Sequence, residues 1–252
     1  MLLRRLKQKR AVLWQNVLLM TLWKFSFRVR SSSLKLAVLG GSFNPVHIGH
    51  MALADDVCSS LGYDRVLFVP AAVPPHKEMV PGVSAEERLS MVQIACSTDS
   101  RFVAESCEIE RDGVSYTWDT VDYLEKKYAS SLEGKIGIIL GSDLFAGFHL
   151  WKNAALLAKR CNLILARRPE QSSFAKSANR ALGEYAQLEN SGDSFDISKE
   201  PLFSEAAVLD NPLLPVSSTQ IRNLALSGGG FKYLVPSGVF EYIIGGNLYG
   251  RK

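Results

Sequence analysis

Cysteine is scarce in this chain, and its four cysteines form no paired motif. Cys58, Cys96, Cys107 and Cys161 are widely spaced along 252 residues. A disulfide framework needs a denser pattern, and a zinc site needs closely spaced ligand pairs, so both are disfavoured. We therefore expect free thiols in a reducing compartment and a cytoplasmic location.

Acidic residues are absent from the first 32 positions, which carry eight lysines and arginines. The remaining residues hold 21 basic against 25 acidic side chains, although the whole chain has a formal net charge of +4. The body is therefore mildly acidic. A nucleic-acid partner favours a basic face, and the charge of the body gives no support for one.

A long hydrophobic run is also missing. The apolar stretch at 11–23 is too short to span a membrane, and Gln15 and Asn16 interrupt it. No A-x-A cleavage site follows, which disfavours a signal peptide. An organelle transit peptide, a membrane-surface segment, a translated leader before the true start, or a disordered extension remain open for residues 1–32. We expect the fold to be a single domain over residues 33–252, with no membrane contact.

Buried strands alternate with helices along this body. Apolar runs predict strands at 35–39, 66–69, 135–140 and 161–166, and helical spacing predicts helices at 48–61, 84–95, 117–124, 151–158, 217–226 and 239–244. Residues 102–103 and 107–109 resemble short extended pieces, 71–82 a proline-rich loop, and 168–205 an insertion or mobile loop. This order predicts an α/β fold with a Rossmann-like, doubly wound parallel sheet and a small helical part at the C-terminus. Ligands bind beyond the carboxyl ends of such strands.

A glycine-rich loop follows the first predicted strand. Gly40 and Gly41 allow a sharp turn and close approach of the backbone to a ligand. His47 and His50 share one face of the first helical turn, where open amides and the helix dipole attract anions. Gly49 between them would leave room for a base or a phosphate. Imidazoles and amides without a carboxylate favour polyphosphate chemistry.

Six sequence blocks carry a family resemblance. They are GGSFNPVHIGH at 40–50, VPPHK at 73–77, SYTWDTV at 115–121 preceded by Arg111, LGSDLFAGFHLW at 140–151, VSSTQIR at 216–222, and YLVP at 233–236 followed by Tyr242 and Ile243. The first block is the signature of the HxGH nucleotidyltransferase superfamily. The blocks together, over about residues 35–250, resemble the bacterial nicotinate mononucleotide adenylyltransferases.

The resemblance implies transfer of AMP from ATP to nicotinate mononucleotide, which gives deamido-NAD and pyrophosphate in NAD biosynthesis. It implies catalytic roles for His47, His50 and Arg222, with His50 at the reacting phosphate. The implied ATP-binding residues are Gly40, Gly41, Ser42, Phe43, His47, His50, Gly141, Asp143, Ser218, Thr219 and Arg222. The implied acceptor-binding residues are Asn44, Lys77, Thr117, Asp143 and Trp151. Mg²⁺ is implied as a cofactor bound through the ATP phosphates, without protein side chains as ligands.

Ordinary structural roles remain open for several of these residues. Arg222 could be a solvated helix charge, Lys77 a surface lysine, Asp143 a helix cap, and Trp151 a core residue. Ala71, Ala72 and Lys152 depart from the family pattern near the acceptor pocket. These departures concern the choice between nicotinate mononucleotide and its amide counterpart as acceptor, more than the adenylyl transfer itself.

Other functions share parts of this pattern. Phosphopantetheine adenylyltransferases usually have Thr in place of His47 and lack the later blocks. Cytidylyltransferases of the glycerol-phosphate type share only the first block, and class I aminoacyl-tRNA synthetases are longer and carry a KMSKS-like loop. A binding-only sensor would be suggested by loss of His50 or Arg222, and both are present. Oligomeric state is not readable from the sequence.

Overall fold

A computed structural model describes residues 33–75, 82–111, 113–167 and 200–250 of the chain. Contacts divide the chain into residues Met1–Ser33 and Leu34–Lys252, and the description below concerns the second unit. Lys77 and most of the predicted insertion at 168–205 lie outside the described residues.

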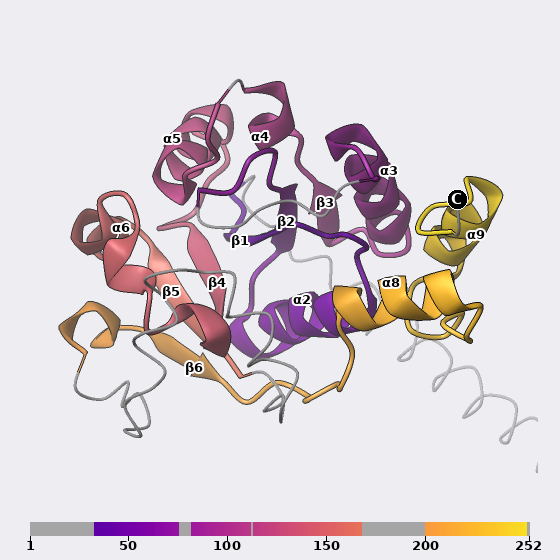
Figure 1. Cartoon of the computed structure of the whole chain (residues 1–252). Coiled ribbons are helices and arrows are strands. Elements are labelled where there is room, and N and C mark those ends of the chain that lie inside the picture. The colour runs from indigo at the N-terminus through magenta and orange to yellow at the C-terminus, as the bar shows by residue number, and fades with distance from the viewer. Residues whose placement is uncertain (1–32, 76–81, 112, 168–199, 251–252) are drawn as a thin grey trace, which may run out of the picture. The chain divides into compact units, whose positions relative to one another are not determined.

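The described strands form one parallel sheet in the order β3-β2-β1-β4-β5-β6 (Figure 1). Their bounds are β1 Leu36–Gly41, β2 Arg65–Pro70, β3 Phe102–Ala104, β4 Gly137–Gly141, β5 Asn162–Ala166 and β6 Ala207–Leu209. All five adjacent pairs are parallel. The predicted doubly wound α/β sheet is confirmed, because the chain runs outward from β1 in one direction and from β4 in the other.

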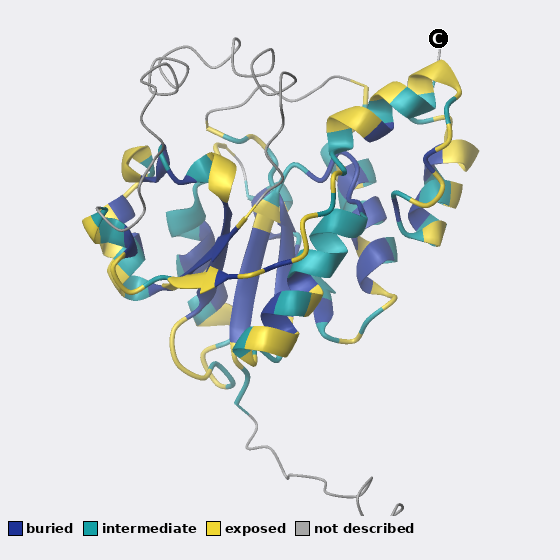
Figure 2. Ribbon diagram, turned by 90° about the horizontal axis from the view of Figure 1, so that it is seen from below, coloured by how far each residue is buried: buried dark blue, intermediate teal, exposed yellow. Residues whose placement is uncertain are grey.

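Helices cover both faces of this sheet. The α-helices are α2 Ile48–Leu61, α3 Ala85–Cys96, α4 Cys107–Glu110, α5 Thr117–Lys127, α6 Ala154–Arg160, α8 Ser218–Ser227 and α9 Ser237–Gly245, and the 3-10 turns are η1 Ser142–Leu144, η2 Phe148–Leu150 and η6 Pro201–Phe203. One core cluster packs α2, α3, α8 and α9 on one face, and the other packs α4, α5 and α6 on the opposite face. Figure 2 shows the buried strands enclosed between these layers.

Local sequence explains the ends of the helices. Ser84 caps α3 by accepting from the Glu87 N–H at 3.2 Å, and the Glu87 side chain accepts from the Ser84 N–H at 2.7 Å. This reciprocal capping box is the N-terminus that the sequence predicts. Gly62 ends α2 with φ 68°, a left-handed conformation that glycine adopts without steric cost.

Two predicted elements differ in the structure. Residues 107–109, predicted as extended, form the short helix α4, with Cys107 and Glu108 on its buried side. The helix predicted from 151 begins at Ala154, because Asn153 before it adopts a left-handed conformation. Trp151 therefore lies in a loop and not on a helix.

Candidate active site

The predicted ligand edge of the sheet includes the point at which the chain reverses direction, between β1 and β4. These strands are neighbours, with Ala37 opposite Gly137 and Val38 opposite Ile138. After β1 the chain goes to α2 on one face, and after β4 it goes through η1 and η2 to α6 on the other. Such a divergence opens a ligand site beyond the carboxyl ends of the two strands. The histidine loop, residues 40–50, begins at the end of β1, and Asp143 follows the end of β4.

The two histidines form a compact pair at the start of α2. His47 is the N-cap residue, and its backbone N–H donates to Nδ1 of His50 at 3.2 Å. The two rings stack with centroids 3.7 Å apart, and the Phe43 ring meets the His50 ring edge-on at 5.0 Å. Because Nδ1 of His50 accepts, a neutral His50 carries its proton on Nε2. This ring nitrogen is then a hydrogen-bond donor, as contact with a phosphate oxygen requires.

The glycines of the loop have unequal roles. A side-chain carbon at Gly40 would meet nothing within 4 Å, so open space borders this residue. At Gly49 it would lie 3.1 Å from the His47 ring and 3.0 Å from Val216. A side chain at position 49 would therefore press against the His47 ring and Val216, so glycine is required here by close packing.

The first turn of α2 offers fewer open amides than the sequence suggested. The Ile48 N–H donates to the Leu234 carbonyl at 3.1 Å, and the His50 N–H to the His47 carbonyl at 2.9 Å. Among the described residues, the Gly49 N–H has no acceptor. One backbone donor, rather than several, is left for an anion here.

The first turns of helix α8 form hydrogen bonds with the histidine loop. Nη1 of Arg222 donates to the Asn44 carbonyl at 2.7 Å, and Nη2 donates to Thr219 Oγ1 at 3.0 Å. The Ser218 hydroxyl donates to the Pro45 carbonyl at 2.8 Å. Burial lowers the pKa of Arg222, which nevertheless remains a cation at neutral pH. The structure thus joins Ser218 and Arg222 to the loop, and Thr219 to Arg222.

Sequence reasoning missed a second arginine beneath this loop. Arg88 of α3 is 2% exposed, and its Nη1 donates to the Ser42 carbonyl at 2.8 Å. No described residue accepts a hydrogen bond from its Nε, and burial lowers its pKa. A signal was available, because Arg88 stands in helical spacing with the buried residues Met91, Val92 and Ala95. A buried cation that forms no ion pair with a described carboxylate favours anions nearby.

Two of the predicted acceptor residues, Thr117 and Trp151, lie at the start of α5 and in the loop before α6. Thr117 is the first residue of α5, and the Trp151 ring packs 5.2 Å from that of Phe148. Lys152 connects the two segments, since its Nζ is 2.8 Å from both carboxylate oxygens of Asp119 and 4.9 Å from the centre of the Tyr116 ring. These contacts bring the segments of Thr117 and Trp151 together.

A buried carboxylate supports the segment that leads into Thr117. Glu108 is 7% exposed, and its Oε1 accepts from the Thr120 hydroxyl at 2.5 Å. Burial raises its pKa, while hydrogen bonds from Thr120 and Ser115 act in the opposite direction. Ser115 in turn accepts from the Ala72 N–H at 3.2 Å. The loop after β2 and the start of α5 are therefore held together. Glu108 was missed because its segment was interpreted as extended.

Asp143 follows β4 as predicted. It is exposed in η1, and Gly141 before it is buried at the end of the strand. An exposed carboxylate at the carboxyl end of a central strand can accept from ribose hydroxyls. The described residues contain no group of three or more His, Cys, Asp or Glu side chains that could hold a metal ion.

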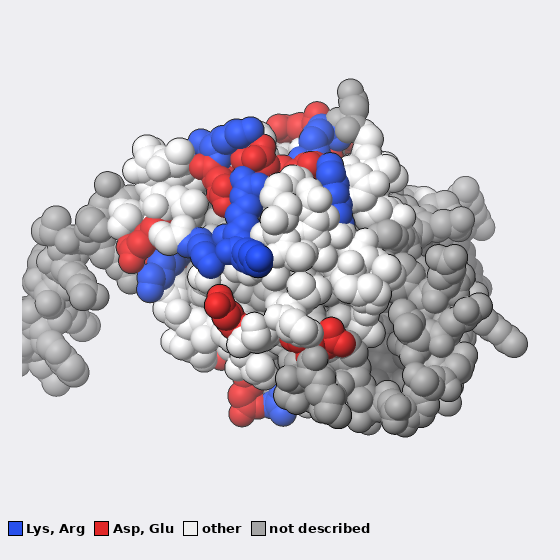
Figure 3. Space-filling view, turned by 90° about the vertical axis from the view of Figure 1, so that its left-hand side faces the viewer, with Lys and Arg blue, Asp and Glu red and all other residues white. Residues whose placement is uncertain are grey.

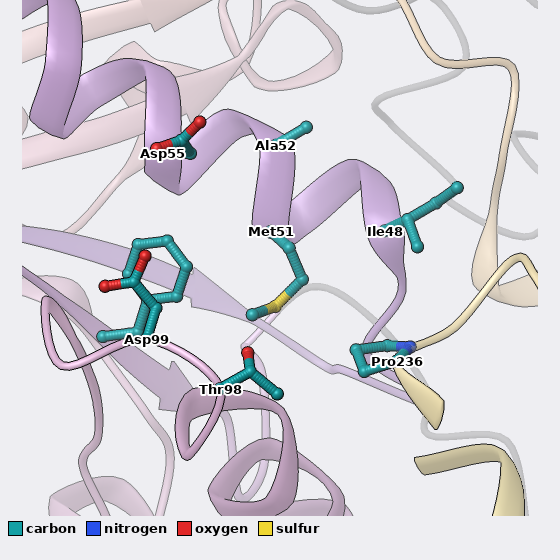
Figure 4. Close-up of a pocket in the computed structure, with 8 residues that line it drawn as sticks. Ile48, Met51, Ala52, Asp55, Thr98, Asp99 and Pro236 are labelled. Carbon is teal, nitrogen blue, oxygen red and sulfur yellow. The ribbon is translucent and has the colours of Figure 1, made fainter. Parts of the chain in front are cut away.

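A cavity of about 380 Å³ lies beside α2 (Figure 4). It is lined by Ile48, Met51, Ala52, Asp55, Thr98, Asp99, Phe102 and Pro236. None of these was predicted as a site residue. Asp55 and Asp99 both pair with Arg101, each at 2.6 Å. Because Ile48 directly follows His47, the cavity adjoins the first turn of α2.

Charges are balanced on the face formed by α5 and α6. Arg160 pairs with Glu125 at 2.6 Å and with Asp122 at 3.0 Å, and Lys126 also pairs with Asp122, at 2.6 Å. Figure 3 shows basic and acidic side chains mixed on this side of the molecule. No helix in the described part of the chain is long and apolar enough to cross a membrane.

Comparison with known proteins decides the family. The family model for cytidylyltransferase-like proteins matches residues 38–224. The chain belongs to this family. Within it, the chain is 39% identical over 216 residues to a probable nicotinate-nucleotide adenylyltransferase of Treponema pallidum, covering 86% of this chain and 99% of that protein. It is 35% identical to a protein of the same name from Pseudomonas fluorescens, covering 85% and 97%.

Solved structures support the fold of this cytidylyltransferase-like chain. A nicotinic acid mononucleotide adenylyltransferase of Plasmodium falciparum, complexed with NaAD, aligns with a TM-score of 0.63 over 86% of this chain and 97% of that one. Its sequence is 18% identical, so the likeness concerns the fold alone.

Proposed function

We propose that this chain transfers the adenylyl group of ATP to nicotinate mononucleotide, giving deamido-NAD and pyrophosphate in NAD biosynthesis. The observation that carries the proposal is the histidine pair in its loop, with Nδ1 of His50 occupied by a backbone donor at 3.2 Å. The names of the relatives that the chain matches over nearly their whole length support the choice of acceptor.

The chemistry needs positioning more than acid–base catalysis. The 5′-phosphate of the acceptor is ionised at neutral pH, and one of its oxygens attacks the α-phosphorus of ATP. A new P–O bond forms, the bond to the bridging oxygen of the β-phosphate breaks, and its electrons leave with pyrophosphate. His50 donates to the α-phosphate as charge builds there. Arg222 and His47 steady the neighbouring phosphates, and the amides and hydroxyls beside them complete the ATP contacts.

Acceptor recognition belongs to the start of α5 and to the segment after β4. Thr117 and its neighbouring amides receive the nicotinate carboxylate, Trp151 stacks on the pyridine ring, and Asp143 accepts from ribose hydroxyls. Lys77, from the segment outside the described residues, bridges the acceptor phosphate and ATP.

Mg²⁺ enters this scheme with ATP. The side chains around the loop are imidazoles and guanidiniums, and they suit phosphate oxygens rather than a hard cation. The phosphates are therefore the fitting ligands, and the ion neutralises part of their charge. We also propose that residues 33–252 form the catalytic domain, and that four free thiols suit a reducing compartment such as the cytoplasm.

The experiment is a matrix of two donors against three acceptors. Full-length protein with Mg²⁺ is given ATP or CTP, together with nicotinate mononucleotide, its amide counterpart or phosphopantetheine. We expect pyrophosphate and deamido-NAD from ATP with nicotinate mononucleotide. Better use of phosphopantetheine or the amide would overturn the acceptor, and better use of CTP would overturn the donor. The same assay on a chain that starts at residue 33 tests the domain proposal.

A further inference from the structure

Asn44 is held from two distant parts of the chain. It is 2% exposed and lies in the loop between β1 and α2. Its backbone carbonyl accepts from Arg222, as described above, and its side-chain Oδ1 accepts from the Tyr249 hydroxyl at 2.5 Å. Tyr249 follows α9 near the C-terminal end of the described chain, 205 residues from Asn44.

The hydrogen bond from Tyr249 decides which way the Asn44 carboxamide faces. Burial raises the pKa of Tyr249 above its ordinary value, so the phenol keeps its proton at neutral pH and donates. Its partner is then the carbonyl oxygen Oδ1, and the two N–H groups of Nδ2 point away from Tyr249. Among the described residues, no acceptor bonds to Nδ2.

A donor at this point suits the chemistry of the loop. Asn44 adjoins Phe43, whose ring contacts His50, and its backbone carbonyl accepts from Arg222, a proposed phosphate ligand. Two N–H groups can donate to an anionic phosphate, whereas a carboxylate of the same shape would repel it. An unfixed carboxamide could rotate and present its oxygen instead.

We propose that Tyr249 is a positioning residue, whose hydroxyl holds the Asn44 carboxamide with Nδ2 available to a substrate phosphate. The C-terminal segment then takes part in building the site without touching substrate. This inference rests on the proposed function only for the choice of substrates, because the hydrogen bond itself belongs to the chain.

The test removes only the hydroxyl. Tyr249→Phe keeps the ring, and Tyr233→Phe makes the same change at a tyrosine that is 83% exposed. We expect Tyr249→Phe to lower kcat/KM by about tenfold, the effect of one lost hydrogen bond, and Tyr233→Phe to leave it unchanged. Melting curves accompany both variants. Wild-type kinetics in Tyr249→Phe would overturn the proposal.

A double-mutant cycle separates positioning from simple packing. In an Asn44→Ala background the carboxamide is gone, so Tyr249→Phe should have almost no further effect on kcat/KM. An undiminished effect in that background would show that Tyr249 acts by another route. The kcat/KM of each variant is compared with that of the protein from which it was made, on the acceptor that the wild-type protein uses. Absence of deamido-NAD from wild-type protein would therefore refute the proposed acceptor and not this inference.

A third variant covers the case in which Tyr249→Phe fails to fold. In Asn44→Asp, Tyr249 can still donate to one carboxylate oxygen, which leaves the other, negatively charged, in the place of Nδ2. We expect Asn44→Asp to lower kcat/KM further than Asn44→Ala does. If Asn44→Ala is the more damaged variant, the donor role of Nδ2 is refuted.

Discussion

One backbone hydrogen bond positions the imidazole of His50, the proposed donor to the α-phosphate. The His47 N–H occupies Nδ1, and the stacked His47 ring and the edge of Phe43 limit how the imidazole can turn. The protonated Nε2 is therefore presented in a fixed direction before substrate arrives. Preorganised donors of this kind stabilise developing charge without the cost of reorganisation.

Replacing His50 by alanine should remove this donor while leaving the fold intact. We expect kcat to fall by about 10²- to 10³-fold, the effect typical of one lost transition-state donor. His149→Ala, at an exposed histidine in η2, is the matched control and should retain activity. Steady-state kinetics and circular dichroism provide the measurements. Near-normal turnover in His50→Ala would remove this residue from the mechanism.

The sequence predicted the central strands and most helices because their apolar residues repeat with the right period. α2 spans Ile48–Leu61 in agreement with its spacing, and the α3 capping box begins at the predicted serine. Strand β6 could not be recognised, since Ala207 and Val208 are exposed and only Leu209 is buried. Edge strands this short carry no periodic signal.

Most of the candidate site could be predicted for a different reason. The glycine-histidine loop and the Ser218 to Arg222 segment are local patterns, so their residues could be named from the sequence. The supporting residues Arg88 and Tyr249 act through contacts with residues 46 and 205 positions away. Long-range contacts of this kind leave little trace in a single sequence.

The start of α5 and the loop before α6 form a second unit whose charge can be tested. Lys152 and Asp119 pair here beside Thr117, and both are partly exposed, at 42% and 33% of their side-chain areas. An exposed pair of this kind contributes little to stability, about 0–1 kcal/mol. The effect of this ion pair on the binding of an acidic ligand depends on whether Lys152 or Asp119 loses its charge.

Neutralising Lys152 and neutralising Asp119 should therefore shift the preference for nicotinate mononucleotide over the amide in opposite directions. Lys152→Gln leaves the Asp119 carboxylate uncompensated, so KM for nicotinate mononucleotide should rise by about two- to fivefold. Asp119→Asn frees the ammonium and should lower that KM by a similar factor. The amide mononucleotide, which lacks the carboxylate, should respond less in both variants. A shift of both variants in the same direction would mean that packing, rather than charge, governs the acceptor site.

At the scale of the whole molecule, the two core clusters enclose all four cysteines as free, buried thiols. Burial is the largest cause of their altered acidity. It raises the pKa of Cys58 to about 11 and those of Cys96, Cys107 and Cys161 to about 12, from an ordinary value of 9.0. The folded state therefore keeps these protons at a pH at which the unfolded chain releases them.

Alkaline solution should for this reason destabilise the fold before the native thiols ionise. The stabilising contribution of these protonated thiols is fully present below the unfolded pKa of 9.0 and is lost as the pH rises through 11 to 12. At about pH 10 each thiol should lower the free energy of unfolding by about 1 kcal/mol. Urea unfolding at pH 8 and pH 10 measures this difference. A thiol reagent at pH 8 supplies the control, because it should label the cysteines only once urea has exposed them. Rapid labelling of the folded protein, or equal stability at both pH values, would contradict the burial on which this prediction depends.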